Sequence, residues 1–155
     1  MCSVLEFLTA FGAIATASVA AWAGIYAVNS QREATAKDIY RDYLKLAFEN
    51  PEFANPSEFF WDLSSLKKNE QYRWFVAFML NSCDEIARSE LRGKGWREII
   101  SLDDTKKREG WRKTILLDLQ MHKEYLDDSC SEFKADGGWD LYSSELKNIA
   151  KKALS

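Results

Sequence analysis

The chain of 155 residues carries a formal net charge of −3, and 46% of its residues are hydrophobic, 14% aromatic and 29% charged. This composition excludes a disordered chain, and the length suits one domain with its own core. The three cysteines form no disulfide framework and have no metal-like spacing. We expect Cys83 and Cys130 to be buried as small apolar residues.

The first predicted element is a membrane span. Residues 7–28 contain no charged side chain, and a hydrocarbon core of about 30 Å needs roughly 20 apolar residues in a helix. A cleaved signal sequence is the alternative, but Glu6 is the only charged residue before the run, so the basic n-region is missing. The nearby basic residues follow the span, at Arg32, Lys37, Arg41 and Lys45. We therefore expect the N-terminus outside and the C-terminal part in the cytoplasm.

Small residues recur at every fourth position of this span, at Gly12, Thr16, Ala20 and Gly24. Such a stripe lets helix backbones approach closely, and this packing drives helix association in lipid. The stripe predicts a homo-oligomer held by membrane-helix packing. The alternative is an alanine-rich span that does not associate.

The periodicity of the remaining chain is helical, and no strand pattern competes with it. One apolar face runs from Ala36 to Ala47 and ends before Asn50-Pro51. A second amphipathic helix is expected from Tyr72 to Ala87. We predict an all-α protein, with a transmembrane anchor over residues 1–30 and a compact cytosolic domain of about four to five helices over residues 31–155.

A third helix is expected after the sequence SLDD, where Ser101 and Asp104 have the spacing of a capping box. We expect it to run to about Phe133, before a loop around the only Gly-Gly pair of the chain. A last helix should extend from about Tyr142 to Leu154.

The residues needed for catalysis are not assembled in any visible motif, so no catalytic residue, metal or cofactor is predicted. His122 is the only histidine and lies on the apolar face of its helix, where burial is the commoner role. Adjacent acids such as Asp127-Asp128 point apart on a helix. The glycine motifs of phosphate-binding loops and of serine hydrolases are absent.

A net basic segment interrupts this acidic protein and contains two tryptophans. Guanidinium and ammonium groups beside indoles suit phosphates and stacked bases. The candidate ligand-binding residues are Arg88, Arg92, Lys94, Trp96, Arg97, Lys106, Lys107, Arg108, Trp111 and Arg112. Three interpretations stay open: a solvated surface, a contact with anionic lipid headgroups, and a site for a phosphorylated ligand or nucleic acid. Duplex nucleic acid is not expected.

The chain has, in order, a single N-terminal span, the segment AKDIYRDYLKLAFENPEFANP, an aromatic-rich helix and the closing segment GWDLYSSELKNIAKKAL. This order resembles that of small bacterial proteins with a membrane anchor and a helical cytosolic domain. In size and layout the chain is similar to the membrane effectors of type III CRISPR antiviral defence that sense cyclic tetra-adenylate. That resemblance implies an inner-membrane effector, not an enzyme, with the cyclic oligonucleotide bound between the cytosolic domains of a tetramer. The alternative is a membrane adaptor that recruits a protein partner to the bilayer.

Overall fold

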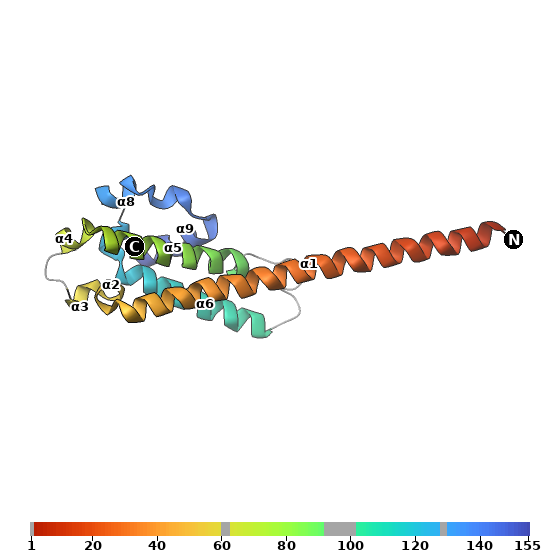
Figure 1. Ribbon diagram of the computed structural model, residues 1–155, viewed down its shortest axis with the longest axis horizontal. Coiled ribbons are helices and arrows are strands. Elements are labelled where there is room, and N and C mark those ends of the chain that lie inside the picture. The colour runs from red at the N-terminus through yellow and green to blue at the C-terminus, as the bar shows by residue number, and fades with distance from the viewer. Residues whose placement is uncertain (1, 60–62, 92–101, 128–129) are drawn as a thin grey trace. The chain divides into compact units, whose positions relative to one another are not determined.

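The computed structural model describes residues 2–59, 63–91, 102–127 and 130–155, and the described part is all helical, as the sequence predicts (Figure 1). The chain divides into two compact units, unit 1 (Met1–Thr35) and unit 2 (Ala36–Ser155). The sequence-based division after residue 30 stays a prediction. Figure 1 labels most of the helices, whose bounds are α1 (Cys2–Glu49), α2 (Pro51–Ala54), α3 (Pro56–Phe59), α4 (Leu63–Lys67), α5 (Glu70–Ile86), α6 (Leu102–Met121), α7 (Lys123–Leu126), α8 (Ser131–Ala135) and α9 (Ser144–Leu154).

The described residues of unit 1, 2–35, all belong to α1. Of the described helices, α1 is the one that is long and apolar enough to cross a membrane. Its most apolar window has a mean hydropathy of 1.2, and none of that window is buried inside the structure. Large apolar side chains such as Trp22 and Ile25 are therefore without a protein core around them.

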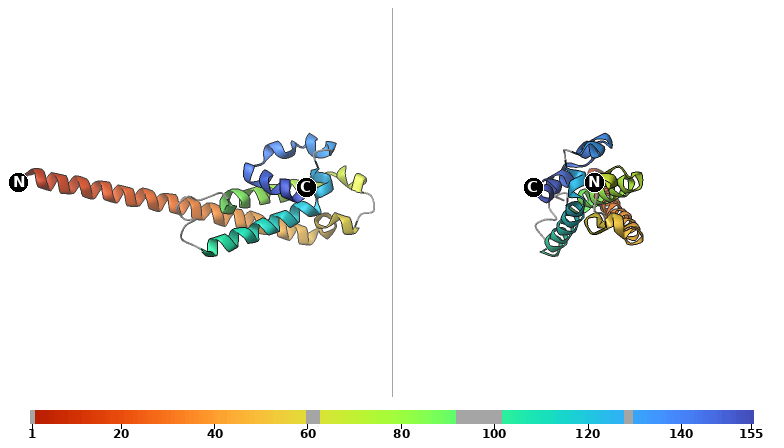
Figure 2. Two further views of the ribbon diagram at one scale, coloured as in Figure 1. Left: turned by 180° about the vertical axis from the view of Figure 1, so that it is seen from behind. Right: turned by 90° about the vertical axis from the view of Figure 1, so that its left-hand side faces the viewer.

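Unit 2 is built around α5 and the remainder of α1. Tyr43 of α1 packs its ring against Phe75 of α5, and Tyr40 donates a hydrogen bond to Asp118 of α6. The left view of Figure 2 shows these helices lengthwise, next to one another. Helix α9 packs against α6 and α5, and α4 packs against α5. The core is made of the apolar faces that the sequence predicts, including fully buried Met79 and Leu119.

Local sequence signals explain where these helices begin and end. Proline follows Asn50 and begins α2, so α1 ends at Glu49. The side chain of Asn69 accepts hydrogen bonds from two backbone N–H groups at the start of α5, and the Ser143 hydroxyl accepts one from the backbone N–H of Leu146 at the start of α9. Gly137 has φ of +99°, in the left-handed region that favours glycine. It leads into a short 3₁₀ helix, η3 (Gly138–Leu141).

The prediction of one helix from the SLDD sequence to Phe133 is wrong. Helix α6 ends at Met121, and α7 and α8 follow as separate short helices. A continuous helix would carry Phe133 about 18 Å along its axis beyond Met121. With the chain turned at His122, Phe133 instead packs against Tyr125 and joins the core. The proposed cap residue Ser101 lies outside the described residues.

Candidate functional site

The predicted basic segment falls into a part that the structure describes and a part that it does not. Outside the described residues lie Arg92, Lys94, Trp96 and Arg97. The described candidates lie on α6 and on η1, a π-helical turn (Ala87–Leu91) that directly follows α5. Their surroundings separate cations that are held by carboxylates from cations that are free to contact a ligand.

Arg88 is held by an acid of the preceding helix. Its Nη2 lies 2.7 Å from Oδ2 of Asp84, which is almost fully buried. The other carboxylate oxygen of Asp84 accepts hydrogen bonds from the backbone N–H of Ser143, at 2.9 Å, and from the Ser143 hydroxyl. Arg88 therefore belongs to a network that ties α5 to the start of α9, rather than to an open binding surface.

Lys107 is held in a similar way by Glu90, whose side chain is only 5% exposed. The Lys107 Nζ atom lies 2.8 Å from Oε2, and Lys37 Nζ lies 3.0 Å from Oε1 of the same carboxylate. Burial alone raises the pKa of Glu90, but the hydrogen bonds with both lysines outweigh it and hold the pKa below its ordinary value. The carboxylate is thus kept charged between two cations.

Trp111 is not an open stacking surface for a base. Its side chain is half-buried, and its ring packs edge-on against Tyr40 at a centroid distance of 5.3 Å. Arg108 is half-buried and also has an interaction partner. Lys106 is exposed at the start of α6. The Trp111 indole, Arg88 and Lys107 therefore serve the fold of unit 2.

A cavity of about 350 Å³ between α6 and α9 is lined by several charged side chains. Arg112, Lys113 and Lys152 line it together with Leu91 at its wall. Lys113 is paired with an acid of its own helix, but within the described residues neither the Arg112 guanidinium nor the Lys152 ammonium group has a hydrogen-bond or ion-pair partner. The cavity's remaining lining residues are Glu109, Leu116, Glu145, Asn148 and Ile149. Its free donors are thus a guanidinium and an ammonium from two different helices.

The structure also contains a buried polar cluster that the sequence does not predict. Asp118 accepts a hydrogen bond of 2.7 Å from the Tyr40 hydroxyl and lies 3.9 Å from the thiol of Cys83. Burial raises the pKa of Asp118 more than these two donors lower it. Burial also raises the pKa of the Cys83 thiol, so Cys83 is not a reactive thiolate at neutral pH.

His122 is buried, as its place on the apolar face predicts. The Tyr72 hydroxyl lies 3.0 Å from its Nδ1 atom, and burial lowers the pKa of His122 to about 4. The imidazole is therefore neutral at pH 7. No group of three or more histidine, cysteine or acidic side chains that could hold a metal is found within the described residues.

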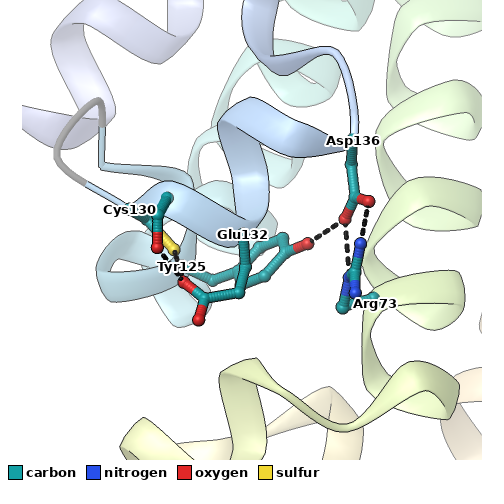
Figure 3. A network of polar contacts seen from close by, with 6 residues as sticks. Arg73, Tyr125, Cys130, Glu132 and Asp136 are labelled. Atoms are coloured by element: carbon teal, nitrogen blue, oxygen red, sulfur yellow. Dashed lines mark hydrogen bonds and ion pairs between the residues drawn. The ribbon is translucent and has the colours of Figure 1, made fainter.

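A second cavity, of about 540 Å³, lies beside α5 and has an ionic network at its wall. Arg73 donates two hydrogen bonds to Asp136, and the Tyr125 hydroxyl donates a third, of 2.6 Å, to the same carboxylate (Figure 3). Trp74 and Leu141, which also line this cavity, are 71% and 64% exposed. No local pattern could reveal this network, because Arg73 and Asp136 are far apart in the sequence.

The small-residue stripe lies on α1 in unit 1. A Cβ atom added at Gly24 would meet nothing within 4 Å, and the side chains of Thr16 and Ala20 are exposed. Helix association through the stripe stays a prediction.

Comparison of the chain with protein-family models, with curated protein sequences and with solved structures finds no match.

Proposed function

We propose that this protein is a single-span membrane protein whose helical domain binds a phosphorylated ligand in the cavity between α6 and α9. The ligand class suggested by the sequence resemblance is a cyclic oligoadenylate, and the response is exerted through association of the spans. No catalytic step is part of this proposal. The observation that carries it is the pair of free cations, Arg112 and Lys152, in one cavity.

The membrane part of the proposal rests on solvent exposure along α1. Apolar side chains of unit 1, such as Val19 and Trp22, are exposed although they are large and hydrophobic. Contiguous exposed apolar surface of this kind marks contact with a membrane or another protein. A bilayer would cover it on all sides, with residues from Ala36 onward in the cytoplasm.

The ligand part rests on charge and geometry. Arg112 presents a planar guanidinium that can donate two parallel hydrogen bonds to one phosphate, and Lys152 adds a point charge from α9. Because the two donors come from different helices, a phosphate between them would bridge α6 and α9. Glu109 and Glu145 also line the cavity and leave only a small net positive charge, which favours a ligand with few phosphates at each cavity.

The size of the cavity limits what one domain can hold. Ligand pockets commonly measure about 300–1,000 Å³, so 350 Å³ suits a single nucleotide unit. A cyclic oligonucleotide exceeds this volume and would have to be shared between equivalent cavities of several copies. A symmetric oligomer offers the same residues to each repeat of such a ligand.

Isothermal titration calorimetry tests this proposal with the full chain in lipid nanodiscs. The probes are cyclic tetra-adenylate, adenosine monophosphate and inorganic phosphate. We expect saturable binding that weakens at least about tenfold in Arg112→Ala and in Lys152→Ala, because each loses a charged hydrogen bond. Arg41→Ala and Lys45→Ala are the matched controls, since both side chains are exposed on α1 and already pair with aspartates.

Equal affinities in all four variants would overturn the assignment of the cavity. If none of the three probes binds, the proposal of a phosphorylated ligand is overturned.

A second candidate function is a membrane adaptor, favoured by the exposure of Trp74 and Leu141 beside the 540 Å³ cavity. Exposed aromatic side chains next to a hollow are typical of protein-binding hot spots. If this function holds, nucleotides leave the thermal unfolding curve unchanged. One protein should then be captured from detergent extracts by the native chain and by Phe48→Ser, but not by Trp74→Ser.

A further inference from the structure

The carboxylate of Glu90 forms ion pairs with both α1 and α6, two of the helices on which the proposed function depends. It receives Lys37 from α1, shortly after the boundary between the two units, and Lys107 from α6. Both ammonium groups lie within 3.0 Å of it, and Glu90 itself is almost fully buried. A buried carboxylate that loses an ion-pair partner leaves an uncompensated buried charge, which is strongly destabilising.

Glu90 is next in sequence to a residue that lines the proposed binding cavity. Its neighbour on the same π-helical turn, Leu91, lines the cavity together with Arg112 and Lys152. π-Helical turns are uncommon and occur often at functional sites. A shift of η1 from the π-helical to the α-helical hydrogen-bonding pattern would displace Leu91 at the cavity wall and the Glu90 carboxylate together.

We propose that Glu90 is a positioning residue that couples occupancy of the α6–α9 cavity to the ionic contact with Lys37. This inference rests on the proposed function. A ligand that contacts Arg112 of α6 and Lys152 of α9 binds the two arrangements of η1 unequally, and so alters the hold of Glu90 on Lys37. Lys37 lies on the helix that continues from the span, so the contact is placed to connect cavity and anchor.

Linkage makes the coupling measurable from both ends. If the ligand alters the Glu90–Lys37 contact, then removal of that contact must alter ligand affinity by the same free energy. Lys37 does not line the cavity, so a change in affinity on its substitution does not come from a lost contact inside the cavity. Lys45 serves as the control, because it lies on the same helix and pairs with Asp42 on the surface at 2.8 Å.

The experiment measures affinity for cyclic tetra-adenylate in nanodiscs for the native chain, Lys37→Gln, Lys37→Arg and Lys45→Gln, with thermal unfolding to confirm that each is folded. We expect Lys37→Gln to change the affinity at least about fivefold, the lower end of common coupling energies. Lys37→Arg, which keeps the charge, should stay close to native, and Lys45→Gln should not differ from it. Hydrogen exchange over residues 36–49 should change on ligand addition in the native chain but not in Lys37→Gln.

Native affinity in folded Lys37→Gln would overturn the coupling while leaving the binding site intact. Absence of binding by the native chain would overturn the proposed function and the coupling together. The two failures are therefore distinguishable.

Discussion

Helix α1 places apolar side chains in two opposite environments. In unit 1, Val19 and Ile25 are 66% and 63% exposed, whereas Tyr40 and Tyr43 in unit 2 are almost fully buried. The backbone is helical throughout, so secondary structure does not distinguish the two regions. The difference lies in what covers the side chains: a protein core covers the second region, and we propose that lipid covers the first.

The largest expected effect comes from charges placed in the first region. Two arginines, Val19→Arg with Trp22→Arg, should cost about 5–7 kcal/mol of insertion free energy if their separate costs add. The protein should then leave the membrane pellet on alkaline carbonate extraction. Phe48→Arg is the control, because Phe48 is 88% exposed in unit 2 and a charge there should not alter extraction. Retention of the double variant in the pellet would contradict a lipid environment.

The second region should instead respond to loss of core volume. Met79 is fully buried on α5, so Met79→Ala should lower the free energy of unfolding by about 2–5 kcal/mol. Phe48→Ala should change it by less than about 0.5 kcal/mol, since its side chain lies in solvent. Denaturant unfolding followed by circular dichroism measures both, and similar losses in the two variants would show that α1 and α5 are not packed as described.

Low pH should weaken unit 2 through His122. Its pKa of about 4 in the folded state lies below the ordinary value of 6.5, so the unfolded chain binds more protons once the pH falls below 6.5. The free energy of unfolding should therefore drop by about 3 kcal/mol between pH 6.5 and pH 4.

His122→Gln removes this contribution and is compared with the native chain across the same pH range. Asp118 and Glu90 titrate in both proteins, so the difference between the two curves isolates the imidazole. Parallel curves would show that His122 is not buried in its neutral form.

The smallest effect is expected for surface ion pairs on α1. Arg41 and Asp38 form a pair that is well exposed on both sides, and such pairs contribute at most about 0.5 kcal/mol. Arg41→Ala should therefore leave the unfolding midpoint nearly unchanged. A shift as large as that of Met79→Ala would mean that this face of α1 is covered.

Sequence patterns predict the helices of this chain better than they predict its site. The apolar faces of α5 and α9, and the proline that follows Asn50, depend on local periodicity and chain chemistry, and both faces are confirmed as buried. The break at His122 could not be predicted, because it follows from packing of residues that come later in the chain.

The basic segment shows the same limit. Counting charges along the sequence groups Arg88, Lys107 and Arg112 together, but only Arg112 is without a carboxylate partner among the described residues. The acids that hold the other two, Asp84 and Glu90, are buried by the fold. Lys152, which shares the cavity with Arg112, lies in another part of the sequence. Tertiary structure decides which cations lack a carboxylate partner, and sequence periodicity cannot predict this.

Cysteine accessibility tests the two environments of α1 most directly. Val19→Cys and Phe48→Cys are made separately with Cys2→Ser, and the native Cys83 and Cys130 give little background because both are buried. In sealed membrane vesicles with the helical domain outward, a water-soluble maleimide should label Phe48→Cys rapidly, and Val19→Cys only after denaturation in detergent. Equal labelling of both positions in intact vesicles would contradict the proposal that lipid surrounds unit 1 and water surrounds unit 2.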